Sequence, residues 1–214
     1  MRARAANTQR RTRIQQENED RILEAALEVF SARGFRGSTI DQVAKAAGMS
    51  KPNLLYYFRS KDAIHHRLIE RLLDTWLDPL RGLDPDGDPI AEIHGYIRRK
   101  IEMARELPRE SRLFANEILQ GAPRIMDELQ GQLKKLVDEK AAVIRIWQNQ
   151  GKLAKCDPWH LIFSIWATTQ HYADFDVQVR AVLGDPRYGE QRFDDAARFL
   201  ELLFSDGLRP RVGK

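Results

Sequence analysis

Apolar residues recur every three or four positions along almost the whole chain, which is the spacing of amphipathic helices. No stretch of any length alternates between apolar and polar residues with the two-residue period of a strand. The first clear helix covers about 18–33, and Gly34 stands where such a helix would end. Its apolar stripe consists of Ile22, Ala26, Val29 and Phe30. The pattern predicts an all-α protein.

Helix caps and turn residues divide the chain into about nine helices. The segment Ser38–Asp41 resembles a capping box that opens a short helix ending at Ala47. Ser50 can cap the next helix, and Ser60 can cap the long one after it, which Pro79 closes. Beyond the turn-rich stretch GLDPDGDP, helices are expected near 90–106, 109–120, 123–150, 157–184 and 190–206.

Charge separates the chain into two regions. Residues 1–64 hold 12 Lys and Arg against 7 Asp and Glu, a net charge of +5, and the remaining 150 residues hold 23 against 24, a net of −1. A basic segment beside a nearly neutral remainder indicates a polyanionic partner at one end. The first 13 residues contain five arginines and no acid, so a disordered basic arm is expected over 1–17.

Composition and motifs disfavour several classes of protein. Cys156 is the only cysteine, so neither an intrachain disulfide nor a cysteine-rich zinc site is expected. No apolar run approaches the roughly 20 residues that span a bilayer, and the N-terminus lacks the apolar core of a secretory signal. The chain is therefore expected in the cytoplasm. It contains no phosphate-binding glycine loop, nucleophile motif or metal-ligand spacing, so we expect no enzyme activity, no cofactor and no metal.

The stretch GMSKPNLLYYF, residues 48–58, has the pattern of a helix-turn-helix. Two short helices joined by a glycine turn would place the second helix in the major groove of DNA. Successive residues of a helix are 100° apart around its axis, which places the residues of this second helix in two opposite sectors, one facing inward and one facing outward. Leu54, Leu55 and Phe58 fall in the inward sector, whereas Pro52, Asn53, Tyr56 and Tyr57 fall in the outward one.

Several outward or helix-starting residues carry chemistry that suits DNA. Asn53 can pair with adenine or donate to a phosphate, and tyrosine hydroxyls commonly donate to phosphate oxygens. Lysines near helix starts add their charge to that of the helix dipole. The candidate DNA contacts are Thr39, Lys51, Asn53, Tyr56, Tyr57 and Lys61. The alternatives stay open that the tyrosines are surface aromatics or pack beneath the fourth helix, and that the basic arm is a solvated tail or enters the minor groove.

Residues 39–64, TIDQVAKAAGMSKPNLLYYFRSKDAI, resemble the DNA-binding signature of the TetR family of bacterial transcriptional regulators. The resemblance implies an N-terminal helix-turn-helix domain of three helices, over 18–62. It also implies a helical ligand-binding and dimerisation domain, over 63–214, that dimerises through its last two helices. The chain departs from the family pattern at Leu55, where the family has tyrosine, and at Tyr57, where it has histidine. The helical wheel favours Tyr56 as the phosphate contact.

The stretch 160–175 supplies the candidate ligand residues. Gln170 lies on one helical stripe with Phe163 and Trp166, and a carboxamide buried without a partner costs about 1–3 kcal/mol. Residues of other helices could converge on it: Trp76, Phe114, Asn116 and Trp147. A flat apolar slot with amide groups suits a planar molecule that has both N–H donors and C=O acceptors. The alternative is that the aromatic residues form core and that Gln170 lies at the solvent or at a dimer interface.

Further stretches resemble the family's regulators of pyrimidine utilisation. They are NLLYYF, LLDTWLDPL, SRLFANEILQGAPRIMDEL, LVDEKAAVIRIW, GKLAKCDPWHLIFSIWATTQHYADF and GLRPR. This resemblance implies a homodimeric repressor of pyrimidine-catabolism genes that a pyrimidine such as uracil releases from palindromic operator DNA. The alternative is a TetR-family repressor that responds to a lipophilic or acyl ligand. An all-α enzyme, the third hypothesis, has no motif in its favour.

Overall fold

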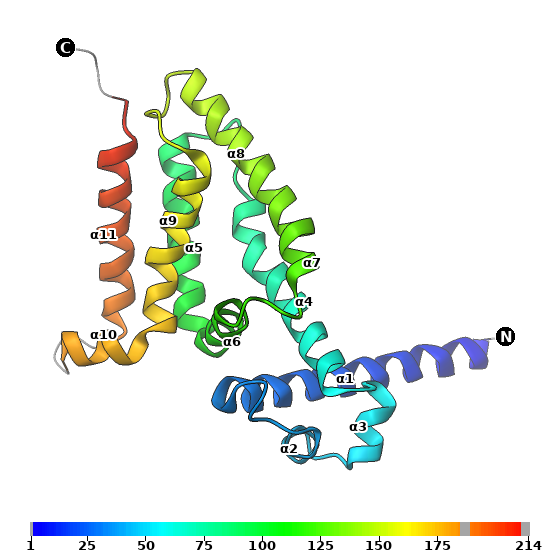
Figure 1. The fold of residues 1–214 in the computed structure, drawn as a ribbon. Helices are drawn as coiled ribbons and strands as arrows, with labels where there is room; N and C mark the ends of the chain where they lie inside the picture. The colour runs from blue at the N-terminus through cyan, green and yellow to red at the C-terminus, as the bar shows by residue number, and fades with distance from the viewer. Residues whose placement is uncertain (1, 185–188, 211–214) are drawn as a thin grey trace. The chain divides into compact units, whose positions relative to one another are not determined.

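Helices are the only regular structure among the described residues, 2–184 and 189–210, in the computed structural model (Figure 1). The described side chains begin at residue 13. The prediction of an all-α protein is therefore confirmed. In the described part of the chain, no helix is both long and apolar enough to cross a membrane.

The N-terminal helices follow the predicted order. They are α1 (Arg2–Arg33), α2 (Ile40–Ala46), α3 (Lys51–Tyr57) and α4 (Lys61–Arg81). Gly34, with a φ of 68°, ends α1 as expected, because this left-handed conformation favours glycine. The expectation of disorder over 1–17 differs from the structure, in which α1 already begins at Arg2. Glutamates one turn after basic or amide residues support this helix, as between Arg13 and Glu17, whose Nε–Oε1 distance is 2.9 Å.

The helices after α4 depart from the expected bounds at two main places, and α4 itself departs at a third. The helices after α4 are α5 (Pro89–Glu106), α6 (Pro108–Leu119), α7 (Met126–Glu128), the π-helical turn η1 (Leu129–Leu133), α8 (Lys134–Asn149), α9 (Pro158–Asp174), α10 (Asp176–Leu183) and α11 (Gln191–Leu208). The helix expected over 157–184 breaks at Phe175, whose backbone (φ −112°, ψ 29°) is not helical. The helix expected over 123–150 passes through η1. Pro79 lies inside α4 instead of closing it, two residues before the last.

The chain forms two compact units. The first unit comprises Met1–Leu73 with Leu113–Ile125, and the second comprises Asp74–Arg112 with Met126–Lys214. The first unit thus extends to Leu73, whereas the expected domain boundary was at residue 62. Both α4 and α6 contribute residues to each unit.

In the first unit, the apolar face of α1 forms the core with α2 and α3. Ile22, Ala26 and Phe30 of α1 are fully buried, as are Val43 of α2 and Leu54 of α3. Burying a side chain of this size contributes about 1.5–3 kcal/mol. The short helices α2 and α3 are held by this core, because isolated helices of seven residues are not stable in water.

In the second unit, α5 packs against both α9 and α11, and α8 packs against α9. Figure 1 shows α5, α9 and α11 running side by side. The buried apolar residues at these contacts include Ile93, Ile97, Ile101, Leu161, Ile162, Ile165, Phe193 and Leu200. This layer of helices positions the side chains of α5 and α9 described below.

Candidate functional site

Thr39 caps α2, one residue later than the expected capping box. Its hydroxyl accepts the backbone N–H of Gln42 at 3.2 Å, and Gln42 Oε1 accepts the backbone N–H of Thr39 at 2.9 Å. Ser38 is instead buried and donates to the carbonyl of Gly34 at 2.6 Å. The side chain of Thr39 remains exposed at the start of α2, the first helix of the helix-turn-helix.

Except for Tyr57, which was expected to face outwards and is half-buried against α1, the residues of α3 face as the helical wheel predicts. Leu54 and Phe58 are buried, Leu55 is half-buried, and Asn53 and Tyr56 are exposed. Ser50 begins the helix by accepting the backbone N–H of Asn53 at 3.3 Å. The polar and aromatic face of α3 is therefore open to a partner such as DNA.

The two tyrosines differ in environment. Tyr57 is half-buried, and its hydroxyl accepts a hydrogen bond of 2.8 Å from Nδ2 of Asn18 in α1. Tyr56 is 76% exposed, and its ring meets that of Tyr57 edge to face at 5.2 Å between centroids. Among the described residues nothing hydrogen-bonds the Tyr56 hydroxyl. Tyr57 thus orients α3 on α1, and Tyr56 keeps its hydroxyl available.

The two candidate lysines also differ. Lys51 is exposed, and its Nζ lies 2.9 Å from Oδ2 of the exposed Asp41. Lys61 is half-buried and donates to the carbonyls of Phe35 and Ser38, at 2.8 Å each. These carbonyls follow the C-terminus of α1. The structure therefore places Lys61 inside the first unit, where it fixes the loop after α1, rather than on an open face.

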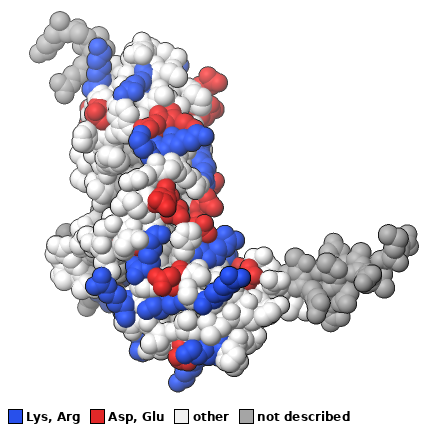
Figure 2. All heavy atoms as spheres, turned by 45° about the vertical axis from the view of Figure 1, so that its right-hand side comes forward, with Lys and Arg blue, Asp and Glu red and all other residues white. Residues whose placement is uncertain are grey.

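Basic side chains are frequent on the first unit. In the view of Figure 2, blue Lys and Arg outnumber red Asp and Glu in its lower part, around the first three helices. Exposed basic residues near α2 and α3 are Arg33, Arg36, Lys45, Lys51 and Arg59. A positive surface beside the exposed face of α3 suits a phosphate backbone.

A buried ion network ties the end of α6 into the first unit. Glu117 is 2% exposed and accepts from Arg124 twice, from the backbone N–H at 3.0 Å and from Nη1 at 3.2 Å. Arg124 also donates to Asp62 at 3.2 Å. His65 is 1% exposed, with its Nε2 3.7 Å from Oε2 of Glu117. Burial lowers the pKa of His65 to about 4, although the charge of Glu117 opposes that shift. We call these four residues the Glu117 network.

The candidate ligand residues are divided between the two units. Phe114, half-buried, and Asn116, exposed, belong to the first unit, and the others belong to the second. Phe163 is 47% exposed, so it does not line a buried slot. The indole N–H of Trp147 donates to the carbonyl of Pro85 at 2.9 Å, which gives this buried residue a structural role.

Trp76 and Trp166 instead belong to a buried polar cluster of the second unit. The cluster consists of Trp76, Tyr96, Lys100, Ser111, Trp166 and Asp174. Nε1 of Trp166 donates to the Tyr96 hydroxyl at 2.5 Å, and the Ser111 hydroxyl donates to Oδ1 of Asp174 at 2.5 Å. Half-buried Gln170 lies one helical turn from both Trp166 and Asp174.

Lys100 is the charged centre of this cluster. It is 3% exposed, and its ammonium lies 5.2 Å from the centroid of the Trp76 ring. Burial lowers the pKa of Lys100 to about 7, and the charge of Asp174 acts in the opposite direction. Burial also raises the pKa of Asp174, against the hydrogen bond from Ser111. An amine and a carboxyl with such shifted pKa values mark a candidate binding site.

Sequence reasoning missed Tyr96, Lys100, Ser111 and Asp174. One signal was present for Lys100. It occupies the apolar stripe of α5, whose buried members include Ile93, Ile97, Ile101 and Ala104. A lysine at such a position is rarely left without a function or a partner.

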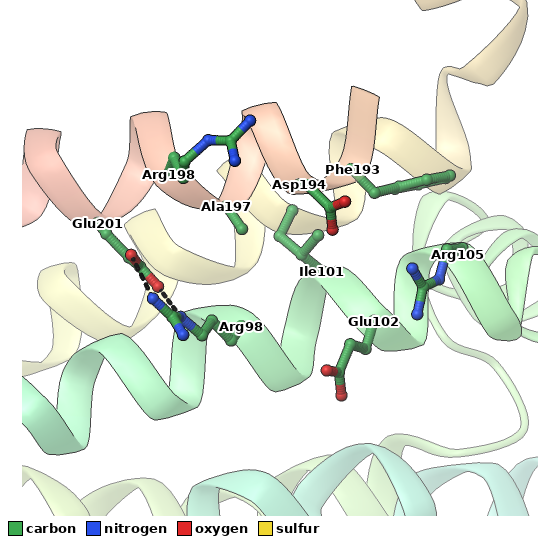
Figure 3. A pocket seen from close by; sticks show the side chains of 9 residues that line it. All are labelled: Arg98, Ile101, Glu102, Arg105, Phe193, Asp194, Ala197, Arg198 and Glu201. Atoms are coloured by element: carbon green, nitrogen blue, oxygen red, sulfur yellow. Dashed lines mark hydrogen bonds and ion pairs between the residues drawn. The ribbon is translucent and has the colours of Figure 1, made fainter. Parts of the chain in front are cut away.

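A groove of about 350 Å³ lies in the second unit between α5 and α11 (Figure 3). Its charged lining residues are Arg98, Glu102, Arg105, Asp194, Arg198 and Glu201. The guanidinium of Arg98 donates to both carboxylate oxygens of Glu201, with 3.0 Å between Nη2 and Oε2. The three positive and three negative side chains balance, and none of the candidate ligand residues lines the groove.

Comparisons with known proteins agree with these features. Residues 22–68 match the model of bacterial regulatory proteins of the tetR family, and residues 69–211 match that of the C-terminal region of YcdC-like proteins. The HTH-type transcriptional regulator RutR of Escherichia coli (strain K12) is 48% identical over 204 residues, which are 95% of this chain and 96% of that protein.

Solved structures share the fold at lower identity. Salmonella enterica GusR is 22% identical with a TM-score of 0.64, over 89% of this chain and 94% of that one. AibR, solved in complex with isovaleryl coenzyme A and operator DNA, is 16% identical with a TM-score of 0.64, over 87% and 97%. The family models over 22–211 and the 48% identity to RutR show that the chain belongs to the TetR family of transcriptional regulators, which are DNA-binding proteins and not enzymes.

Proposed function

We propose that this regulator represses genes of pyrimidine utilisation and leaves its operator when a pyrimidine such as uracil binds the second unit. The buried polar cluster carries the proposal. It combines the Lys100 ammonium, the Trp76 indole N–H and the Asp174 carboxylate in an otherwise apolar layer. A small planar ligand with both carbonyl oxygens and N–H groups can pair with all three. The resemblance to pyrimidine-utilisation regulators supports the same ligand class.

On the DNA side, we assign base or phosphate contact to Asn53 and phosphate contact to Tyr56, Lys51 and Thr39. All four are exposed, Thr39 at the start of α2 and the other three on α3. Tyr57 and Lys61, with hydroxyl and ammonium occupied inside the unit, support α3 and the loop after α1. A regulator bound to the bacterial chromosome acts in the cytoplasm, where we place it.

The regulator acts as a homodimer through α9 and α11 in this proposal. Large apolar side chains are exposed on these helices, opposite to the faces that pack within the unit: Phe163, Phe199, Leu202 and Leu203. Contiguous exposed apolar surface of this kind usually marks an interface. A two-fold dimer reads two half-sites, so the operator is expected to be palindromic. The substitution Leu202→Glu should yield monomers in light scattering and abolish operator binding.

Ligand binding reaches the DNA-binding unit through α4 and α6. Trp76 is on α4, and on α6 Ser111 bonds to Asp174 in the second unit while Glu117 belongs to the buried network of the first. Ser111 and Glu117 are six residues apart, about 9 Å along one helix axis. The regulator exists in a form that fits the operator and a form that does not. The ligand releases the operator only if its affinity is higher for the form that does not fit.

An acyl or lipophilic effector is the second candidate. It would leave the buried ammonium of Lys100 facing hydrocarbon, which disfavours it because a buried charge needs hydrogen-bond partners.

The test has two parts. Selection from random duplex DNA should enrich a palindrome, and uracil should release the purified protein from it. In a thermal shift assay, ligand at 100 times its dissociation constant stabilises by about 2.7 kcal/mol, or roughly 5–11 °C for a chain of this size. Uracil should give such a shift, a fatty acyl compound should not, and Gln170→Leu should reduce it. A shift with the acyl compound alone would overturn the pyrimidine assignment and leave DNA binding standing.

A further inference from the structure

Two donors of the polar cluster have no hydrogen-bond partner among the described residues. The indole N–H of Trp76, a residue 9% exposed, has no partner among the described residues. The ammonium of Lys100, a residue 3% exposed, also donates to none of them and lies 5.2 Å from the centroid of the Trp76 ring. Buried donors in native proteins are nearly always paired, so this pair of donors needs an explanation. An acceptor-rich ligand supplies one.

Asp174, whose charge acts on Lys100, supplies an acceptor. Oδ1 of Asp174 accepts a hydrogen bond from the hydroxyl of Ser111, and no described residue donates a hydrogen bond to Oδ2. The charges of Lys100 and Asp174 interact, but the two side chains do not form a direct ion pair. The site therefore offers two donors and one acceptor whose natural partners are absent from the protein itself.

We propose that the effector site recognises a cyclic imide, in which Lys100 and Trp76 donate to the two carbonyl oxygens and Asp174 accepts the ring N–H. This proposal deepens, and rests on, the assignment of a pyrimidine effector. Uracil carries such a group at O2, N3–H and O4. Binding gives a partner to the Trp76 N–H, to the Lys100 ammonium and to the second carboxylate oxygen of Asp174, and the neutral ligand leaves the opposite charges of Lys100 and Asp174 separated by polar atoms.

The same pattern excludes close analogues. Cytosine has an amino group where uracil has O4, and its N3 carries no hydrogen. In this site the amino group of cytosine, a donor, would face a donor of the protein, and its N3, an acceptor, would face the carboxylate of Asp174. A site built to hydrogen-bond a ligand rejects such analogues strongly, because its buried groups stay unpaired.

Charge around Lys100 determines how binding depends on pH. Lys100 on α5 faces Asp174 on α9, and Asp174 is in turn influenced by Arg112 on α6 and His171 on α9. Because the pKa of Lys100 in the free protein is about 7, the ammonium is present below that pH and is lost above it. A carbonyl partner stabilises the ammonium, so affinity for a neutral imide should fall as the pH rises above about 7.

The experiment measures dissociation constants by titration calorimetry on the full chain with four ligands of similar size: uracil, 1-methyluracil, 3-methyluracil and cytosine. Uracil and 1-methyluracil, which keep the imide, should bind. In 3-methyluracil a methyl group replaces the N3 hydrogen and lies against Asp174, and in cytosine N3 carries no hydrogen. Both should therefore bind at least about 100-fold more weakly than uracil.

Two variants complete the test. Lys100→Met removes the ammonium and should weaken uracil binding about 10- to 100-fold, since bonds from a charged donor are the stronger ones. Trp76→Phe keeps an aromatic side chain, although a smaller one, and removes the N–H, for a loss of about 3- to 10-fold. The controls are Lys155→Met, at an exposed lysine, and Trp159→Phe, whose indole bonds to Asp138 outside the cluster; both should bind as wild type.

The outcomes separate this inference from the proposed function. Equal binding of uracil and 3-methyluracil, or unchanged affinity in Lys100→Met, overturns the imide assignment while the pyrimidine effector stands. Absence of any pyrimidine binding overturns both, and operator binding measured in parallel reports on the DNA-binding assignment alone. If Lys100→Met keeps or gains thermal stability yet no longer binds uracil, the role of Lys100 is in recognition and not in folding.

Discussion

The Glu117 network and the buried polar cluster both place charged side chains inside an apolar fold, but they treat those charges differently. In the network, Glu117 and Arg124 satisfy each other with two hydrogen bonds, and Asp62 takes a third. In the cluster, no described residue accepts a hydrogen bond from the buried Trp76 N–H or from the ammonium of the buried residue Lys100. A buried charge with its partners in the protein holds the fold together, whereas one without them is a cost that a ligand can offset.

The strongest way to break this comparison is to remove Glu117. Glu117→Gln keeps the shape but leaves the guanidinium of Arg124 without its buried counter-charge. We expect the free energy of unfolding to fall by about 2–4 kcal/mol. Urea denaturation measures it, with the exposed Glu139→Gln as control. A change below 0.5 kcal/mol would show that the network contributes little to stability.

Acid should weaken the Glu117 network through His65. Its pKa is about 4 when folded and 6.5 otherwise, so between these values the unfolded chain binds a proton that the folded chain does not. The free energy of unfolding should therefore fall by up to about 3 kcal/mol as the pH drops from 6.5 to 4. Denaturation curves at a series of pH values test it. In His65→Leu this part of the slope should disappear; an unchanged slope would assign it to other groups.

Lys100→Met should raise the free energy of unfolding, whereas Glu117→Gln should lower it. Replacing an unpaired buried charge by an apolar side chain of similar length is expected to stabilise the ligand-free protein by about 1–3 kcal/mol. Thermal unfolding without ligand measures the gain, beside Lys155→Met, which should show none. Loss of stability would mean that Lys100 has structural partners and that the contrast between the two regions is wrong.

The smallest effects concern the two tyrosines of α3. Tyr56→Phe should weaken operator binding about 2- to 10-fold, because one neutral hydrogen bond to phosphate is lost, and leave stability unchanged. Tyr57→Phe should lower stability by about 1 kcal/mol, since Asn18 loses its acceptor. Fluorescence anisotropy and thermal unfolding distinguish the two. If Tyr57→Phe alone weakens DNA binding, the assignment of their roles is reversed.

Local patterns were sufficient to predict the helical class and the helix-turn-helix. The orientation of Leu54, Phe58, Asn53 and Tyr56 follows from the 100° step of a helix, which is a property of adjacent residues. The caps at Ser50 and Ser60 were likewise predictable, because a cap needs only a side-chain oxygen and an N–H three residues later. Bounds were less predictable where tertiary contacts decide them, as at Phe175 and Pro79.

The ligand residues show where local patterns end. Trp76 was a candidate from its sequence context, and it lies in the polar cluster. Phe163 was a candidate on the same ground, yet it is exposed on α9. A helical wheel separates two apolar faces but does not tell which of them packs within the unit and which is left for a second copy of the chain.

The sequence by itself determined that the chain is helical, that its basic N-terminal part carries a helix-turn-helix, and that Asn53 and Tyr56 point outwards. Those properties depend on spacings of a few residues. Only the tertiary structure placed Lys100 of α5 over Trp76 of α4 and opposite Asp174 of α9, and only it tied Tyr57 to Asn18 and Lys61 to the loop after α1. The pairing of charges and donors buried between helices depends on residues distant in the chain, which no local pattern specifies.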